Sequence, residues 1–89
     1  MQIGLVKGNV VSTQKDSSLV GCKLLLIQHV DTGGNAVGKT EVAVDTFGAG
    51  AGELVLLCSG SSARSMFSNS QAPIDLAVVG IIDTIEKNL

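Results

Sequence analysis

Aromatic residues are almost missing from this chain. Among its 89 residues there is no tryptophan and no tyrosine, and the only aromatic side chains are those of Phe47 and Phe67. Positive charge is also scarce, because six Lys and Arg are outnumbered by eight Asp and Glu, which gives a net charge of −2. Proteins that bind single-stranded nucleic acids usually combine aromatic stacking platforms with a positive groove. A nucleic-acid-binding module is therefore only the alternative interpretation of this sequence.

Residues that commonly hold metals or act as nucleophiles are few as well. The chain has one histidine, His29, and two cysteines, Cys22 and Cys58, which are far apart and form no Cys-x-x-Cys motif. Both cysteines fall in apolar segments, and we expect reduced, structural thiols. His29 has no obvious acidic partner in the sequence, and the serines within residues 59–62 are remote from it, which disfavours a hydrolase triad. We assign no catalytic residue, cofactor or metal ligand and expect no enzymatic activity.

Long apolar runs are missing too. Residues 1–11 lack the basic start and the uninterrupted apolar stretch of a secretory signal peptide. No segment approaches the roughly 20 apolar residues that a membrane-spanning helix needs. These absences lead us to expect a cytoplasmic protein that does not bind membranes.

The chain has short apolar segments instead, separated by polar or glycine-rich turns. We predict β-strands within residues 3–11, 22–30, 41–45, 53–59 and 74–85. Ser61 or Ser62 is predicted to cap a short helix that runs from Ala63 to Phe67, between the fourth and fifth strands. The predicted fold is mainly β: a small, five-stranded, partly closed, OB-like barrel formed by a single domain of residues 1–89.

The apolar content predicts contacts between subunits. Hydrophobic residues make up 45% of the chain. Within residues 3–11 they fall on both faces of the predicted strand, with Ile3 and Leu5 on one face and Val6 and Val10 on the other. The core of so small a domain does not need that much aliphatic surface, so part of it is expected at subunit contacts. We therefore predict a homo-oligomer.

A formal phosphate-loop pattern occurs between Gly33 and Thr40, where Gly38 and Lys39 complete the spacing G-x-x-x-x-G-K-[ST]. Such a loop needs a helix that starts at its Lys and Thr, because helical N–H groups and the helix dipole hold the phosphates. Residues 40–47 alternate like a strand instead, so we interpret residues 31–38 as a hairpin loop. The GAGAG segment at residues 48–52 likewise lacks the spacing and the following helix of a dinucleotide-binding fingerprint.

Several motifs in order resemble the EutN/CcmL family of bacterial microcompartment vertex proteins. The resemblance extends over residues 3–84 and rests on GNVVST at 8–13, on Lys15, Leu19, Gly21, Lys23, Leu24 and Leu25, on VAVDTFGAGAGE at 42–53, on GSSAR at 60–64 and on VVGIID at 78–83. The resemblance implies a β-barrel subunit that assembles into a homopentamer and closes the five-fold corners of a polyhedral shell, beside hexameric shell proteins. It further implies a structural role in the microcompartment shell in the bacterial cytoplasm, without a small-molecule substrate.

The resemblance also implies two sets of contact residues. The first matches the V-D-x-x-G-A-G-x-G-E segment of the family and is expected near the five-fold axis, where small residues let five copies of one loop converge. It consists of Asp45, Phe47, Gly48, Ala49, Gly50, Ala51, Gly52 and Glu53. At Phe47 the family tends to have a smaller aliphatic residue.

The second set matches the G-S-S-A-R segment of the family and is expected to contact a neighbouring subunit. It consists of Gly60, Ser61, Ser62, Ala63 and Arg64. Arg64 is predicted near the start of the helix, where a positive charge opposes the helix dipole. Either a surface position or an ion pair between subunits would explain it.

Overall fold

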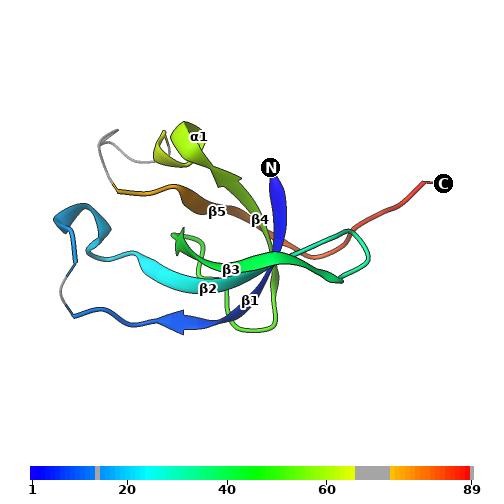
Figure 1. Ribbon diagram of the computed structural model, residues 1–89, viewed down its shortest axis with the longest axis horizontal. Coiled ribbons are helices and arrows are strands. Elements are labelled where there is room, and N and C mark those ends of the chain that lie inside the picture. The colour runs from blue at the N-terminus through cyan, green and yellow to red at the C-terminus, as the bar shows by residue number, and fades with distance from the viewer. Residues whose placement is uncertain (14, 66–72, 89) are drawn as a thin grey trace.

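Residues 1–13, 15–65 and 73–88 are described in the computed structural model of the chain. Their strands form one closed barrel with the neighbour order β1-β2-β3-β5-β4 (Figure 1). The strands are β1 (Gln2–Val10), β2 (Lys23–Val30), β3 (Ala36–Asp45), β4 (Leu54–Ser59) and β5 (Leu76–Ile82). Neighbouring strands are antiparallel, except that β3 and β5 run parallel. The predicted mainly-β, five-stranded barrel is confirmed.

Aliphatic side chains from alternate strand positions fill the inside of the barrel. Val6 of β1, Leu25 and Ile27 of β2, and Val55 and Leu57 of β4 are at most 1% exposed. The register supports this arrangement, since Val6 lies opposite Ile27. Successive side chains of a strand point to opposite faces, so the residues between these core positions point outward.

A second apolar cluster lies on the outside of the barrel, where α1 (Gly60–Arg64) covers part of the sheet. Ala63 of α1 and Ile74 pack with Val44 of β3 and Ala77 of β5, and all four are buried. Figure 1 shows α1 immediately after β4, on the outside of the barrel. The short helix between the fourth and fifth strands is thus confirmed, and it fills a site that the strands alone would leave open.

The start of α1 differs from the prediction. The residue before Gly60 is the N-cap, and its side chain makes no capping hydrogen bond. Gly60 has a φ of +64°, a conformation that glycine adopts without steric cost, and this allows the turn from strand into helix. Ser61 and Ser62 lie within the helix, so the prediction that one of them is the cap is wrong. The helix ends at Arg64, and residues 66–67 of the predicted helix lie outside the described residues.

The hairpin between β2 and β3 is tighter than predicted. β3 starts at Ala36, so the loop predicted over residues 31–38 is limited to residues 31–35. The carboxylate of Asp31 accepts hydrogen bonds from the backbone N–H groups of Gly33 and Asn35, both at 2.9 Å. These bonds reverse the chain within a few residues, because a short acidic side chain can replace backbone partners in a turn.

The segment between β1 and β2 contains a short 3-10 helix, η1 (Ser17–Leu19). The Asp16 carboxylate accepts from the backbone N–H of Ser18 at 3.0 Å and from its hydroxyl at 2.6 Å. Aspartate at such a position satisfies donors that the first turn leaves unpaired. The apolar pattern of the sequence does not predict this turn, which is recognised only by the hydrogen bonds of the Asp16 side chain.

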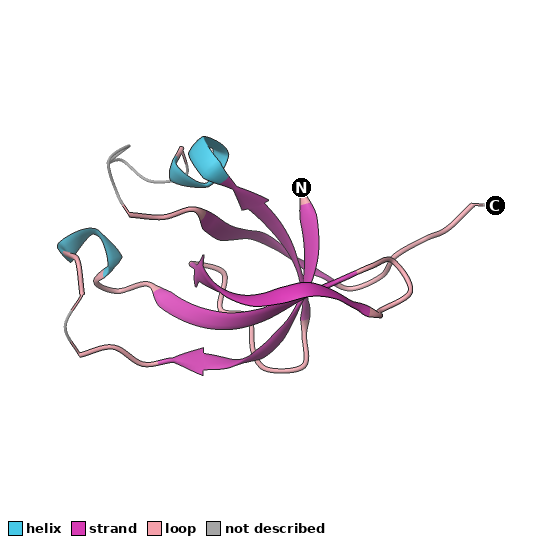
Figure 2. Ribbon diagram, in the orientation of Figure 1, coloured by secondary structure: helices cyan, strands magenta, loops and turns pink. Residues whose placement is uncertain are grey.

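The fifth strand is shorter than predicted. β5 ends at Ile82, whereas the apolar pattern predicts a strand to residue 85. Beyond β5 the chain leads away from the barrel as an extended segment (Figure 2). Among the described residues, no helix has the length and apolarity to cross a membrane.

Candidate functional site: the glycine-alanine loop

The glycine-alanine loop, residues 46–53, connects β3 to β4 and is anchored by a buried carboxylate. Asp45, the last residue of β3, is 1% exposed. Its carboxylate accepts hydrogen bonds from the backbone N–H groups of Phe47 at 2.7 Å, Gly48 at 3.1 Å and Ala49 at 2.7 Å. A buried charge is tolerated when several donors satisfy it, and hydrogen bonds to an ionised acceptor are the strong ones. Asp45 therefore fixes the first half of the loop.

The middle of the loop points toward the core of its own barrel. Ala49 is fully buried and belongs to the same core cluster as Leu25 and Val55. The Ala49 carbonyl accepts a hydrogen bond of 2.7 Å from Nζ of Lys23. Lys23 begins β2 and lies opposite Asp45 in the β2–β3 register. One side chain of the loop thus becomes part of the barrel core, and the ammonium group of Lys23 holds the backbone at that point.

The second half of the loop is tied to β1 and to itself. Gly52 N–H donates to the Val6 carbonyl at 2.8 Å, and Val6 N–H donates to the Glu53 carbonyl at 2.9 Å. Oε1 of Glu53 accepts from the Gly50 N–H at 2.6 Å, and the Glu53 N–H donates to the Gly50 carbonyl at 3.1 Å. The loop consequently takes a defined conformation within a single subunit.

The glycines of the loop differ in whether the backbone conformation requires glycine. Gly48 and Gly52 have φ angles of +86° and +89°, which disfavour any residue with a Cβ. Gly50 has no such backbone angle, and a Cβ there would lie 3.5 Å from Oε1 of Glu53, an ordinary contact. The fold of one subunit therefore requires glycine at positions 48 and 52 but leaves Gly50 open to substitution.

Burial divides the predicted axis residues into two groups. Asp45 and Ala49 are buried within the subunit and cannot offer side chains to another chain. The exposed positions of the loop are Thr46, Phe47, Gly48, Ala51, Gly52 and Glu53. The Phe47 side chain is 51% exposed, so it adds an apolar surface beside a stretch of nearly bare backbone. Such a surface allows close packing against another polypeptide.

The GSSAR segment is divided in the same way. Ser61 and Ser62 are exposed, whereas Ala63 is fully buried against its own barrel. Arg64 is the last helical residue, so its predicted place at the helix start is wrong. Its Nη1 donates to the Ile74 carbonyl at 3.3 Å, which links the end of α1 to the chain that leads into β5. The structure thus gives Arg64 a partner within its own chain.

The structure brings His29 together with an acidic residue that sequence reasoning missed. Nε2 of His29 in β2 lies 2.5 Å from Oε2 of Glu41 in β3, and Lys39 is 3.8 Å from the other oxygen of Glu41. The expectation that His29 has no acidic partner is wrong, because antiparallel pairing of β2 with β3 brings the two strands side by side. In the register Glu41 lies opposite Ile27, two residues from His29, so only the register of the folded hairpin reveals the pair.

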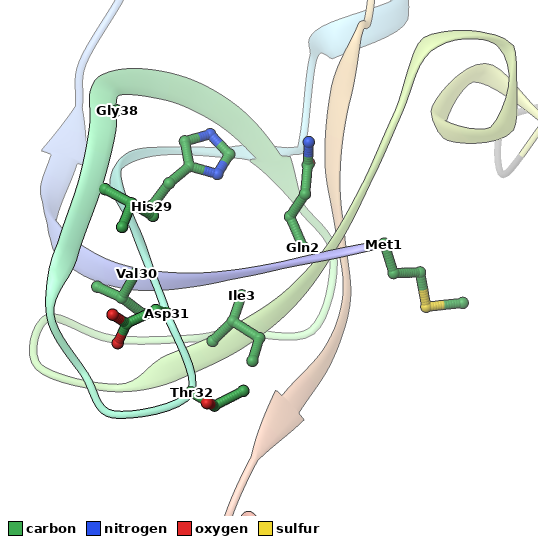
Figure 3. Close-up of a pocket in the computed structure, with 9 residues that line it drawn as sticks. Met1, Gln2, Ile3, His29, Val30, Asp31, Thr32 and Gly38 are labelled. Atoms are coloured by element: carbon green, nitrogen blue, oxygen red, sulfur yellow. The ribbon is translucent and has the colours of Figure 1, made fainter.

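A cavity of about 440 Å³ opens beside His29 (Figure 3). It is lined by Met1, Gln2, Ile3, His29, Val30, Asp31, Thr32, Val37 and Gly38. Among these lining residues the only hydroxyl belongs to Thr32, and Nε2 of His29 is paired with Glu41 instead. The cavity is a mixed polar and apolar hollow at the β2–β3 hairpin.

The residues of the phosphate-loop pattern and the two cysteines belong to the structural framework of the barrel. Lys39 and Thr40 of the phosphate-loop pattern lie within β3, which confirms the interpretation of that segment as a strand. Cys22 and Cys58 are free, half-buried thiols that pack against the apolar cluster beneath α1. Within the described ranges, no three His, Cys, Asp or Glu side chains are grouped so that they could hold a metal ion.

The chain is similar to known proteins over most of its length. A family model described as "Ethanolamine utilisation protein EutN/carboxysome" matches residues 1–83. The carboxysome shell vertex protein CcmL of Nostoc sp. is 59% identical, over 96% of this chain and 85% of the relative. The bacterial microcompartment shell vertex protein PduN of Salmonella typhimurium is 55% identical, over 96% of this chain and 98% of the relative.

Solved structures of similar proteins share the fold. A structure described as "Ethanolamine utilization protein, EutN" has a TM-score of 0.92 at 42% identity and covers 98% of this chain and 91% of that one. The GrpN pentameric microcompartment shell protein from Rhodospirillum rubrum has a TM-score of 0.87 at 49% identity, with coverage of 99% and 100%. The family match extends over most of the chain and the relatives are similar almost from end to end. This chain therefore belongs to the EutN/CcmL family.

Proposed function

We propose that this protein is a structural shell protein of a bacterial microcompartment, which forms a homopentamer and closes the five-fold vertices of the shell. The observation that carries the proposal is its similarity, over nearly the whole chain, to proteins named as shell vertex or pentameric shell proteins. The protein acts in the microcompartment shell within the bacterial cytoplasm. Residues 1–89 act as one domain, since all five strands belong to one barrel that closes between β1 and β4.

In this proposal the glycine-alanine loop lies at the five-fold axis. Support comes from its geometry: the hydrogen bonds of Asp45 and Glu53 hold the loop without any neighbouring subunit. A preformed loop loses little conformational entropy on assembly. The exposed Gly48, Ala51 and Gly52 have a small side chain or none, which allows five copies to approach closely. Ser61 and Ser62, exposed at α1, are the members of the GSSAR segment that remain available to a neighbouring subunit.

The partners in this proposal are further copies of the chain and hexameric shell proteins. The protein is not an enzyme and acts without a cofactor, nucleic acid, membrane or small-molecule substrate. A shell vertex needs shape and contact surface rather than reactive groups, and the strongest polar interactions of the candidate site bind its own backbone. The net charge of −2 and the near absence of aromatic residues disfavour the alternative, a nucleic-acid-binding module.

Shell closure tests the vertex role. The hexameric shell proteins of the same microcompartment would be expressed with and without this chain, and the particles examined by electron microscopy. Closed polyhedra are expected only when this chain is present, because hexamers alone tile flat or tubular surfaces. Closed polyhedra of the same size and number without it would contradict the proposal.

A further inference from the structure

The outer surface of the barrel carries apolar side chains that its own chain leaves uncovered. Leu25 and Ala43 lie opposite each other and are both in the core. Leu26 and Val42, the next pair in this register, therefore point outward. They are 36% and 46% exposed. We call Leu26 and Val42 the hairpin patch.

A second and larger apolar surface lies on the outside of β1, β4 and β5. Val55 and Leu57 fill the core, so Leu54 and Leu56 of β4 point outward. In the register, Leu56 faces Ile3, and Leu54 lies between Leu5 of β1 and Ile82 of β5. These side chains are half-buried and form two neighbouring rows without a charged residue. We call the outward-facing residues Ile3, Leu5, Leu54, Leu56 and Ile82 the β4 patch.

The two patches occupy different sides of the barrel. The neighbour order β1-β2-β3-β5-β4 places the hairpin patch on β2 and β3, and the β4 patch is centred on β4. Leu5 lies opposite Gln28, and Gln28 lies opposite Thr40. The row of outward side chains that contains Leu5 is therefore polar where it crosses β2 and β3. The patches approach each other only where Leu5 of β1 lies diagonally from Leu26 of β2, and the closed barrel turns β3 and β4, on which their centres lie, in different directions.

We propose that the hairpin patch of one subunit packs against the β4 patch of the next subunit around the ring. This inference rests on the proposed pentamer and specifies its interface. A ring of identical subunits repeats one head-to-tail contact, which requires two different complementary patches on every copy. Both patches are apolar and uncharged, as is typical of the centre of a homo-oligomer interface. On the strands, Val44 and Ala77 are already covered by α1, whereas the side chains of the two patches are left uncovered by their own chain.

A single charge in the hairpin patch tests the interface. Val42→Glu would bury five unpaired carboxylates per ring, while in the isolated subunit the new side chain would extend into water. Native mass spectrometry and light scattering should find that the variant needs at least about tenfold higher concentration than wild type to assemble, since 1.4 kcal/mol corresponds to tenfold. Val11→Glu is the control, because Val11 is 87% exposed and lies outside both patches. It should assemble like wild type.

Leu5→Glu tests the second patch in the same way, and circular dichroism checks that each variant is folded. If a variant does not fold, methyl NMR of the wild-type protein decides the question. A soluble paramagnetic chelate should broaden the methyl signals of Val11 strongly and those of Leu26, Val42 and Leu5 weakly. Strong broadening of these three would overturn the interface.

The outcomes separate the interface from the function. A pentameric wild type with dissociated, folded Val42→Glu and Leu5→Glu variants supports both. A pentameric wild type whose Val42→Glu and Leu5→Glu variants stay equally pentameric overturns the interface and leaves the vertex function standing. A hairpin patch that is exposed in the pentamer but protected when hexameric shell proteins are added also overturns it. A wild type that is not pentameric overturns the proposed function, and the interface with it.

Discussion

The carboxylate of Asp45 and the backbone N–H of Ala49 form a buried hydrogen bond of 2.7 Å, which turns the glycine-alanine loop back into its own barrel. The same carboxylate also accepts from Phe47 and Gly48. A loop that is expected to meet four other copies of itself thus takes its shape from a residue inside the subunit. Assembly then brings together surfaces that already have their final form.

Asp45→Asn should destabilise the fold. The substitution keeps the size of the side chain but replaces one accepting oxygen with an NH₂ group, so buried backbone donors lose their partner. We expect the free energy of unfolding to fall by about 2–3 kcal/mol, because unsatisfied buried groups and hydrogen bonds to charges have costs of this size. Urea unfolding at one fixed protein concentration measures it. Asp83→Asn, at an exposed position, should change stability by less than about 0.5 kcal/mol, and an equal loss there would refute the role of Asp45.

Gly50→Leu should weaken assembly without weakening the subunit. Its backbone angle does not require glycine, and a Cβ there meets only Oε1 of Glu53 at 3.5 Å. Five leucine side chains at an axis would collide where five glycines do not. Native mass spectrometry should find fewer pentamers than for wild type, whereas Ala36→Leu, at an exposed position of the β2–β3 hairpin, should assemble normally. An unchanged pentamer mass and population for Gly50→Leu would rule out the loop as the axis.

Arg64→Ala should lower the stability of the subunit by about 1 kcal/mol, the usual net value of one hydrogen bond. The guanidinium group donates to the Ile74 carbonyl and joins α1 to the start of the last strand. Thermal unfolding and light scattering on diluted samples separate this effect from a contact between subunits. Lys7→Ala, at an exposed position, serves as the control. If Arg64→Ala both melts and assembles like the parent, the arginine is only a surface residue.

The turn held by Asp31 should depend on pH. The backbone N–H of Asn35 is the main group that lowers the pKa of Asp31, and Gly33 and Lys87 act in the same direction. Because the folded pKa is lowered, the ionised carboxylate contributes stability above its unfolded pKa, and this is lost as pH falls through the folded value. The amide NMR signals of Gly33 and Asn35 should therefore titrate with a midpoint below 3.8, the ordinary value. A midpoint at or above that value would contradict these hydrogen bonds.

The alternating and apolar segments were sufficient to predict the strands and the place of the helix, because core burial dictates those patterns. Contacts between distant residues were not predictable in the same way. The pairing of His29 with Glu41 depends on strand register, and the burial of Asp45 depends on donors that only the folded loop presents. β3 extends further than its alternation indicates and includes Gly38, whose φ of +71° is more typical of a turn, so the sequence favoured a loop there.

The same limit applies to the candidate site. The motif around the GAGAG segment located the loop, since small residues in a row are rare without a structural reason. It did not distinguish Ala49, which is buried in the barrel core, from Ala51, which is exposed two residues later. That difference arises from the path of the backbone between Asp45 and Glu53, which the amino-acid sequence alone does not predict.

The mass of the assembled wild-type protein tests the central claim most directly. Native mass spectrometry of the untagged chain, supported by light scattering, should find one main species of five 9.1 kDa subunits that persists on dilution. A monomer, a dimer or a six-membered ring as the main species would contradict the account of this protein as a pentameric vertex.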